Sequence, residues 1–202
     1  MVSLMNNDTL LAFITFSIVT SVTPGPNNIM LLTSGVNFGF KRTIPHTLGI
    51  SGGFSFLLLA TGFGLGYLLK TFSIVHLVLK ILGSAYLLYL ALRTAMSRTL
   101  SQKKTAKTQP MTFMEAALFQ WVNPKAWFMA MSAMALYTNP QQPFFSMLIV
   151  TIIFTLLNWP SVSIWAIFGT ALRKFLSEPV RLKWFNITMG ALLAFSVVLL
   201  VQ

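Results

Sequence analysis

The stretch "TPGPNN", Thr23–Asn28, interrupts a segment that is otherwise mostly apolar from about residue 9 to residue 38. Two prolines flank Gly25, so two backbone N–H donors are missing, and each proline ring clashes with the preceding turn of a helix. A helix that runs into this stretch must open and leave carbonyl and amide groups without partners. The sequence therefore predicts a broken helix here. The residues around the break indicate its role.

The composition is that of an integral membrane protein. Of the 202 residues, 55% are hydrophobic and 8% are charged, which leaves too little polar surface to cover a soluble globule. The apolar residues form six blocks, most of them long enough to cross a hydrocarbon core of about 30 Å as a helix. We predict an all-α integral membrane protein with six transmembrane helices in one membrane domain, 1–202. The blocks are roughly residues 9–38, 45–69, 74–95, 113–137, 144–172 and 184–201.

Several classes of function lack the residues that they need. The chain has no cysteine, which excludes disulfides, thiolate metal sites and thiol redox chemistry. No phosphate-binding loop, catalytic triad or metal-ligand spacing is visible, so we predict no enzymatic activity, no cofactor and no metal. The net charge of +11 lies in short loops between apolar blocks. A topology signal explains such charges, and we expect the lipid bilayer rather than nucleic acid as the partner.

Most of the fourteen basic residues fall in loops on one side of the predicted membrane. Basic loops face the cytoplasm, so both termini are predicted to face outward. The longest of these loops, about 97–112, is the predicted basic cytoplasmic connection. No Lys or Arg precedes the first block, so we expect that block to stay in the mature protein. The basic residues on this side are Lys41, Arg42, Arg93, Arg98, Lys103, Lys104, Lys107, Arg173, Lys174, Arg181 and Lys183.

The second half of the chain repeats the first, weakly but in order. Because each half contains three helices, an odd number, two copies must insert in opposite orientations. We predict an inverted 3+3 repeat, with repeat one at about 8–96, repeat two at about 113–202, and breaks in helices one and four. Chance agreement of Pro and Gly in apolar sequence is the alternative. The matching pairs are Pro24 with Pro124, Gly66 with Gly169, and Gly83 with Gly190.

Two helix breaks near the middle of a membrane predict a binding site. Irregular backbone survives at membrane depth only where it faces protein or a wet cavity. Opened helix N-termini attract a carboxylate, and freed carbonyls accept from an ammonium or an ion. The break at Thr23–Asn28 has a counterpart at "NPK", Asn123–Lys125, in the fourth block. The two breaks should meet near the midplane.

The side chains beside the breaks suit a zwitterion. Carboxamides donate and accept at once, and an ammonium deep in a spanning helix costs at least a few kcal/mol unless it is paired or hydrated. The alternative for Lys125 is snorkelling to the outer interface, which lies about 18 Å away along the helix. The side chains beside the breaks are Asn27, Asn28, Asn123 and Lys125.

Three further polar residues are candidates for cavity or coupling roles. Glu115 could carry a proton, but the threonine three residues before it favours a capping box. His46 could act as a pH-linked switch, and an interfacial histidine with one local hydrogen bond is the plainer alternative. Asn158 precedes a proline that should kink the fifth helix, and it fits either a cavity wall or helix packing. Three glycines should let the second helix approach the broken first helix closely: Gly49, Gly52 and Gly53.

At these residues the chain resembles the LysE/RhtB family of amino-acid exporters. No single motif decides the resemblance, and the order, the spacing and the length near two hundred residues make it specific. A basic loop separates the third and fourth blocks, as expected of the family. The motifs are "TPGPNN" at Thr23–Asn28, "GISGGF" at Gly49–Phe54, "LGSAYLLYLALR" at Leu82–Arg93 and "NPKAW" at Asn123–Trp127.

The resemblance implies secondary active export of an amino acid or a close derivative from the cytoplasm, by proton antiport across a bacterial inner membrane. The substrate-binding residues that it implies are Pro24, Gly25, Pro26, Asn27, Asn28, Asn123, Pro124 and Lys125. Members of the family handle lysine and arginine, homoserine and threonine, leucine, or cysteine and its relatives. The three acids of this chain are Asp8, Glu115 and Glu178, so a carboxylate for a second substrate ammonium is hard to find and a dicationic substrate is disfavoured. A membrane-embedded enzyme and a non-transporting assembly subunit stay open as alternatives, as does a homodimer.

Overall fold

The structure is a computed structural model that describes residues 6–64, 66, 73–97 and 109–201. Within these residues it contains eight α-helices, one short 3-10 helix and no strand, which confirms the predicted all-α class. Most of the predicted basic loop, about 97–112, lies outside the described residues. The α-helices are α1 Asn7–Val22, α2 Pro26–Phe38, α3 Phe40–Gly62, α5 Ser73–Ala95, α6 Phe113–Val122, α7 Pro124–Tyr137, α8 Pro143–Leu172 and α9 Pro179–Val201, and the 3-10 helix η1 is Phe175–Ser177.

The apolar helices fit a membrane protein. By length and composition, α3 and α8 can each cross a membrane, and α1 and α2 can do so together as a pair bent by 56°. Large apolar side chains such as Phe56, Leu156 and Phe168 lie exposed on the outside, whereas many polar side chains are fully buried. This distribution suits a surrounding of lipid rather than water.

Both predicted breaks are helix boundaries in the structure. α1 ends at Val22 and α2 begins at Pro26, while α6 ends at Val122 and α7 begins at Pro124. Each of these two prolines occupies the first position of its helix, where the missing N–H removes no helical hydrogen bond. The local chemistry of proline therefore sets both boundaries.

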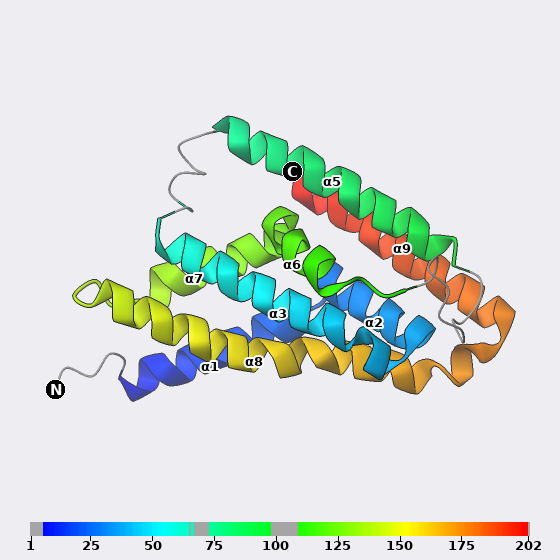
Figure 1. The fold of residues 1–202 in the computed structure, drawn as a ribbon, viewed down its shortest axis with the longest axis horizontal. Coiled ribbons are helices and arrows are strands. Elements are labelled where there is room, and N and C mark those ends of the chain that lie inside the picture. Colours follow the sequence, from blue (N-terminus) through cyan, green and yellow to red (C-terminus); the bar gives the residue numbers. More distant parts are fainter. Residues whose placement is uncertain (1–5, 65, 67–72, 98–108, 202) are drawn as a thin grey trace.

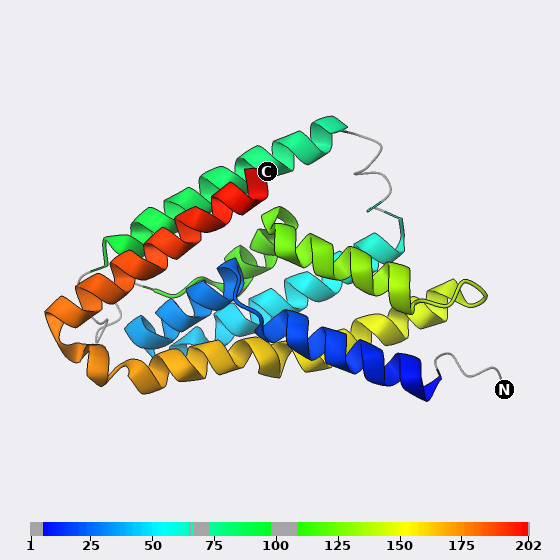
Figure 2. The same ribbon diagram turned by 180° about the vertical axis from the view of Figure 1, so that it is seen from behind.

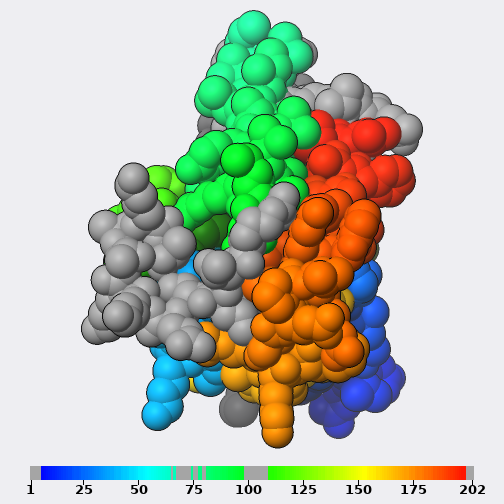
Figure 3. All heavy atoms as spheres, turned by 90° about the vertical axis from the view of Figure 1, so that its right-hand side faces the viewer, coloured from blue at the N-terminus to red at the C-terminus, as the bar shows by residue number. Residues whose placement is uncertain are grey.

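The helices form two groups (Figure 1). α5 and α9 lie side by side along one edge, and α2 and α3 pack on α8 in the body of the molecule. From behind, α1 continues from α2 along the other half of α8 (Figure 2). The α2–α3 junction, the C-terminal end of α5 and the α8–α9 connection share one end, which Figure 3 shows face on. Basic residues of all three predicted cytoplasmic loops belong to these segments.

The core is divided by a polar layer. One large apolar cluster comes from α2, α3, α5, α6, α8 and α9, and another from α1, α3, α7 and α8. Along α8, the buried Asn158 stands between Phe154 of the second cluster and Val162 of the first. On α3, Ser51 stands between Ile50 of the first and Phe54 of the second. Both helix breaks lie at the level of this polar layer.

Glycines allow the helices on the α2 side to touch through their backbones. Gly35 of α2 lies against the backbone of Ala166 in α8, and Gly169 of α8 lies against the backbone of Leu32 in α2. A Cβ atom at either glycine would overlap the backbone of the partner helix. The two glycines therefore hold α2 and α8 together at a distance that no larger residue permits.

The glycines of α3 contact a helix different from the one that we predicted. Gly49 and Gly53 lie against the backbone of Phe113 and Ala117 in α6, rather than against the broken first helix. The prediction was wrong because α1 and α2 pack along α8, which leaves this face of α3 to α6. A group of glycines in the sequence predicts that another helix packs closely against that face, but it does not identify which helix.

We expect Gly53→Ala to destabilise the protein much more than Gly52→Ala does. A Cβ at Gly53 would lie 2.5 Å from the Cα atom of Ala117, whereas at Gly52 it would meet only the ring of Phe113, at 3.1 Å. Overpacking against backbone costs about 1–3 kcal/mol, because two helices must separate. The measurement is the Tm of both variants in detergent. Equal Tm values would contradict the close packing of α3 on α6.

Candidate functional site

The two helix breaks face each other and are joined by one side chain. The Nζ atom of Lys125, at the start of α7, donates a hydrogen bond to the main-chain oxygen of Thr23 at the end of α1. Gly25 leaves room for this contact, since a Cβ there would lie 2.8 Å from the Cδ atom of Lys125. Lys125 therefore points to the other break and not to the interface, and the snorkelling alternative does not apply.

The carbonyl end of α1 is covered by side-chain donors. The Nδ2 atom of Asn28, which is buried, donates to the oxygens of Ser21 at 2.9 Å and Thr23 at 2.8 Å. The indole N–H of Trp165 in α8 donates to the oxygen of Val22 at 3.1 Å. The last carbonyls of a helix carry partial negative charge, so this end of α1 is a preformed acceptor site for cations and N–H groups.

Asn27 is paired with Gln120, a residue outside the predicted site. Its Nδ2 atom donates to Oε1 of Gln120 at 2.8 Å, and Nε2 of Gln120 donates back to Oδ1 of Asn27 at 3.3 Å. Gln120 is fully buried in α6 and also donates to the oxygen of Ala116 at 2.8 Å. The sequence does contain a signal for a role of Gln120, because it is a polar residue in an apolar segment, three residues before the predicted break at Asn123.

Asn123 and Asn158 also have partners. Oδ1 of Asn123 accepts from the backbone N–H of Lys125 at 3.1 Å and so caps α7. Oδ1 of Asn158 accepts from the hydroxyl of Ser51 in α3, and its Nδ2 donates to the hydroxyl of Ser21 in α1, both at 3.0 Å. Asn158 thus joins three helices and also lines the central cavity.

The cavity between the breaks is small. Its volume is about 20 Å³, which is room for about one water molecule. The structure therefore represents a closed arrangement at the breaks. The predicted residues that line this cavity are Gly25, Asn27, Asn28, Asn123, Lys125 and Asn158.

The other predicted residues lie elsewhere or act through the backbone. Pro24 is exposed, and the prolines that begin α2 and α7 shape the main chain rather than line the cavity. Glu115 forms the predicted capping box with Thr112: its carboxylate accepts from the backbone N–H of Thr112 at 2.7 Å. This carboxylate lies at the far end of α6 from the break.

His46 is not the interfacial residue with a local partner that we expected. It is fully buried, and its Nδ1 atom lies 3.2 Å from the hydroxyl of Ser34 in α2. The expectation placed the start of the helix beside Pro45, but α3 begins at Phe40. Six residues of helix place His46 about 9 Å further along the axis than a helix start would. It lines a different pocket, between α2, α3 and α5.

The comparisons agree with this architecture. The family profile described as LysE type translocator matches residues 18–202. The "Cysteine/O-acetylserine efflux protein" of Escherichia coli (strain K12) is 30% identical over 191 residues, which cover 94% of this chain and 95% of the relative. Proteins of the same name in Shigella flexneri serotype 5b (strain 8401) and Escherichia coli O1:K1 / APEC are 30% and 29% identical over the same lengths. No solved structure matches. The resemblance to LysE/RhtB exporters is thereby confirmed, and the chain belongs to the family of LysE type translocators, which are membrane transporters and not enzymes.

Proposed function

We propose that this chain is a secondary active exporter that moves a small neutral amino acid, or an O-acyl derivative of one, out of the cytoplasm across a bacterial inner membrane. Relatives that match nearly its whole length are named for efflux of cysteine and O-acetylserine, and both compounds are neutral zwitterions. The observation that carries the proposal is the contact between the two helix breaks, where the ammonium of Lys125 lies on the carbonyl end of α1.

The Lys125 ammonium indicates how a substrate would bind. The α-ammonium of an amino acid would take its place at the oxygen of Thr23, among carbonyls that already accept from cationic and neutral donors. Lys125, once released, would pair with the substrate carboxylate. The N-terminus of α2 would add its partial positive charge, because the N-cap residue Gly25 provides no side-chain hydrogen bond there. The proposed substrate-binding residues are the eight predicted ones: Pro24, Gly25, Pro26, Asn27, Asn28, Asn123, Pro124 and Lys125.

The positions of the three acids favour a neutral substrate. Asp8 is in the first turn of α1, Glu115 caps α6, and Glu178 pairs with Arg181 at 2.8 Å. None of these carboxylates lines the cavity at the breaks. A second substrate ammonium, as in lysine, would find no anionic partner there, and burying it unpaired would cost several kcal/mol.

Alternating access follows from an inverted repeat of three spans and three spans. In this arrangement α1 with α2 corresponds to α6 with α7, α3 to α8, and α5 to α9. The packing supports the match, because α1 and α2 lie on α8 and α6 and α7 lie on α3. The central cavity must open to each side in turn, past one apolar cluster or the other. Proton entry would drive the cycle, with both termini outside and the whole chain 1–202 acting as one domain.

Counterflow in proteoliposomes tests this function. Vesicles with the purified protein, loaded with O-acetyl-L-serine, should take up labelled external O-acetyl-L-serine, L-cysteine or L-serine, and should not exchange L-lysine. A pH gradient should drive net accumulation, and a protonophore should abolish accumulation but leave exchange. Protein that unfolds cooperatively but exchanges no neutral amino acid would contradict the proposal and favour a non-transporting assembly subunit.

A further inference from the structure

A second and much larger pocket lies on the α2 side of the molecule. Its volume is about 510 Å³, within the range of about 300–1,000 Å³ that is usual for small-molecule sites. α2, α3, α5 and the segment before α6 line it, at the end of the molecule that carries the basic segments (Figure 1). In the predicted orientation this is the cytoplasmic end, from which an exporter takes its substrate.

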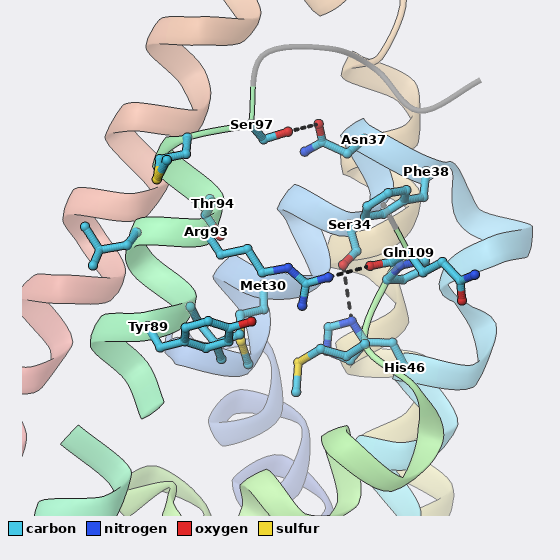
Figure 4. Close-up of a pocket in the computed structure, with 15 residues that line it drawn as sticks. Met30, Ser34, Asn37, Phe38, His46, Tyr89, Arg93, Thr94, Ser97 and Gln109 are labelled. Carbon is cyan, nitrogen blue, oxygen red and sulfur yellow. Dashed lines mark hydrogen bonds between the residues drawn. The ribbon is translucent and has the colours of Figure 1, made fainter. Parts of the chain in front are cut away.

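One cation extends into this pocket (Figure 4). The Nη2 atom of Arg93, from α5, donates to the main-chain oxygen of Gln109 at 3.3 Å. A guanidinium has five N–H donors in a planar fork, so one such bond leaves donors for a bidentate carboxylate. No Asp or Glu is among the described residues that line the pocket. The charge of Arg93 therefore meets no carboxylate in the pocket wall.

A buried imidazole forms the opposite wall. Nδ1 of His46 is 3.2 Å from the hydroxyl of Ser34, and Nε2 has no hydrogen-bond partner within the described part of the chain. When Ser34 donates to Nδ1, the ring proton lies on Nε2 and makes it a donor. A buried donor without an acceptor costs about 1–3 kcal/mol. Nε2 is covered in this structure, so an anionic ligand would supply that acceptor once the side chains over it move aside.

The pocket adjoins the central cavity along one face of α2. Asn27, Met30 and Ser34 recur at intervals of three and four residues, so they share a face. Asn27 lines the central cavity, whereas Met30 and Ser34 line the pocket. From Asn27 to Met30 the helix rises about 4.5 Å. A ligand that passes from one space to the other along this face meets Met30 and the amide pair of Asn27 with Gln120.

We propose that this pocket is a separate loading site, in which the guanidinium of Arg93 and Nε2 of His46 hold the α-carboxylate of the amino acid before it reaches the helix breaks. The site has the volume, the unneutralised cation and the unpaired donor that a small carboxylate requires. The proposal rests on the proposed function for the identity of its ligand. It adds a binding step at a place distinct from Lys125.

Cysteine protection measures this site apart from the breaks. The chain has no cysteine, so Thr94→Cys places one thiol in the pocket wall. The Lys125→Met background removes the cation at the breaks. O-acetyl-L-serine at about ten times its half-protecting concentration should slow labelling of this thiol by a hydrophilic maleimide about tenfold, as mass action requires. Ser177→Cys, exposed in η1 and outside the pocket, is the control and should show no protection.

Arg93→Gln should abolish the protection and leave the rate without ligand unchanged. Arg93→Lys, which keeps the charge but not the fork, should restore part of it. Protection that persists in Arg93→Gln would overturn the proposal. So would an unprotected Thr94→Cys thiol, if Thr94→Cys with Lys125 intact exchanges O-acetyl-L-serine in vesicles, and in that case the proposed function would stand. Absence of protection, together with absence of exchange by the variant that retains Lys125, would overturn both.

Discussion

Lys125→Met is expected to lower substrate exchange about ten- to a hundredfold at low substrate concentration, while the protein stays folded. Methionine keeps the apolar stem and removes the ammonium that lies on the oxygen of Thr23. A hydrogen bond to a charged group contributes about 1.5–3 kcal/mol, and each 1.4 kcal/mol is a factor of about ten. Losing the contact between Lys125 and the substrate carboxylate therefore lowers affinity about ten- to a hundredfold. Counterflow of O-acetyl-L-serine measures the effect. Equal amounts of folded protein are compared, and cooperative thermal unfolding shows that each variant is folded.

Two variants make this result specific. Lys174→Met removes the same charge from an exposed position before η1, and it should exchange substrate like the unmodified protein. Lys125→Arg keeps the charge but brings a larger head group to the space beside Gly25, so it should recover little activity. If Lys125→Met and Lys174→Met exchange substrate equally well, Lys125 does not bind the substrate.

The second large effect is expected at Asn28, where Asn28→Asp should unfold the break. Nδ2 of Asn28 donates to the oxygens of Ser21, Val22 and Thr23. An ionised aspartate has no donor and would face three carbonyl oxygens in a buried place, where an unpaired charge costs far more than a neutral polar group. Asn28→Ala should lower stability by about 1–3 kcal/mol, and Asn28→Asp by more. Tm in detergent and the yield of folded protein measure both.

Asn139→Asp is the matched control for this change. Asn139 uses its side-chain oxygen, which accepts from the backbone N–H of Gln141 at 2.9 Å. Aspartate keeps that acceptor, so the substitution should leave Tm nearly unchanged. A Tm of Asn28→Asp as high as that of Asn139→Asp would show that the carbonyls at the end of α1 do not depend on the Asn28 donor.

The breaks could be predicted from sequence because proline acts on its own backbone. Pro26 and Pro124 each begin a helix, and this preference of proline does not depend on how the rest of the chain packs. The capping box of Glu115 was predictable for the same reason, since its partner is three residues away. Features of this kind depend on local chemistry alone.

The partners of the polar side chains could not be predicted in that way. Asn27, Asn28 and Asn123 look alike in sequence, but one pairs with Gln120, one binds the carbonyls of α1 and one caps α7. Which role each one takes depends on the helix that lies opposite. The same dependence explains why the neighbour of the α3 glycines and the burial of His46 were predicted wrongly.

The acceptor end of α1 consists of main-chain oxygens, and this has a consequence for how such proteins diversify. A point mutation exchanges a side chain and leaves the carbonyl in place, so mutation hardly changes the groups that we propose for binding the substrate ammonium. Mutation can therefore change only the side chains around these main-chain oxygens. Proteins descended from one ancestor with this break would keep the same acceptor groups for the substrate ammonium. They would acquire new substrates through changes at neighbouring positions such as Met30 and Gln120, while the central site stays the same.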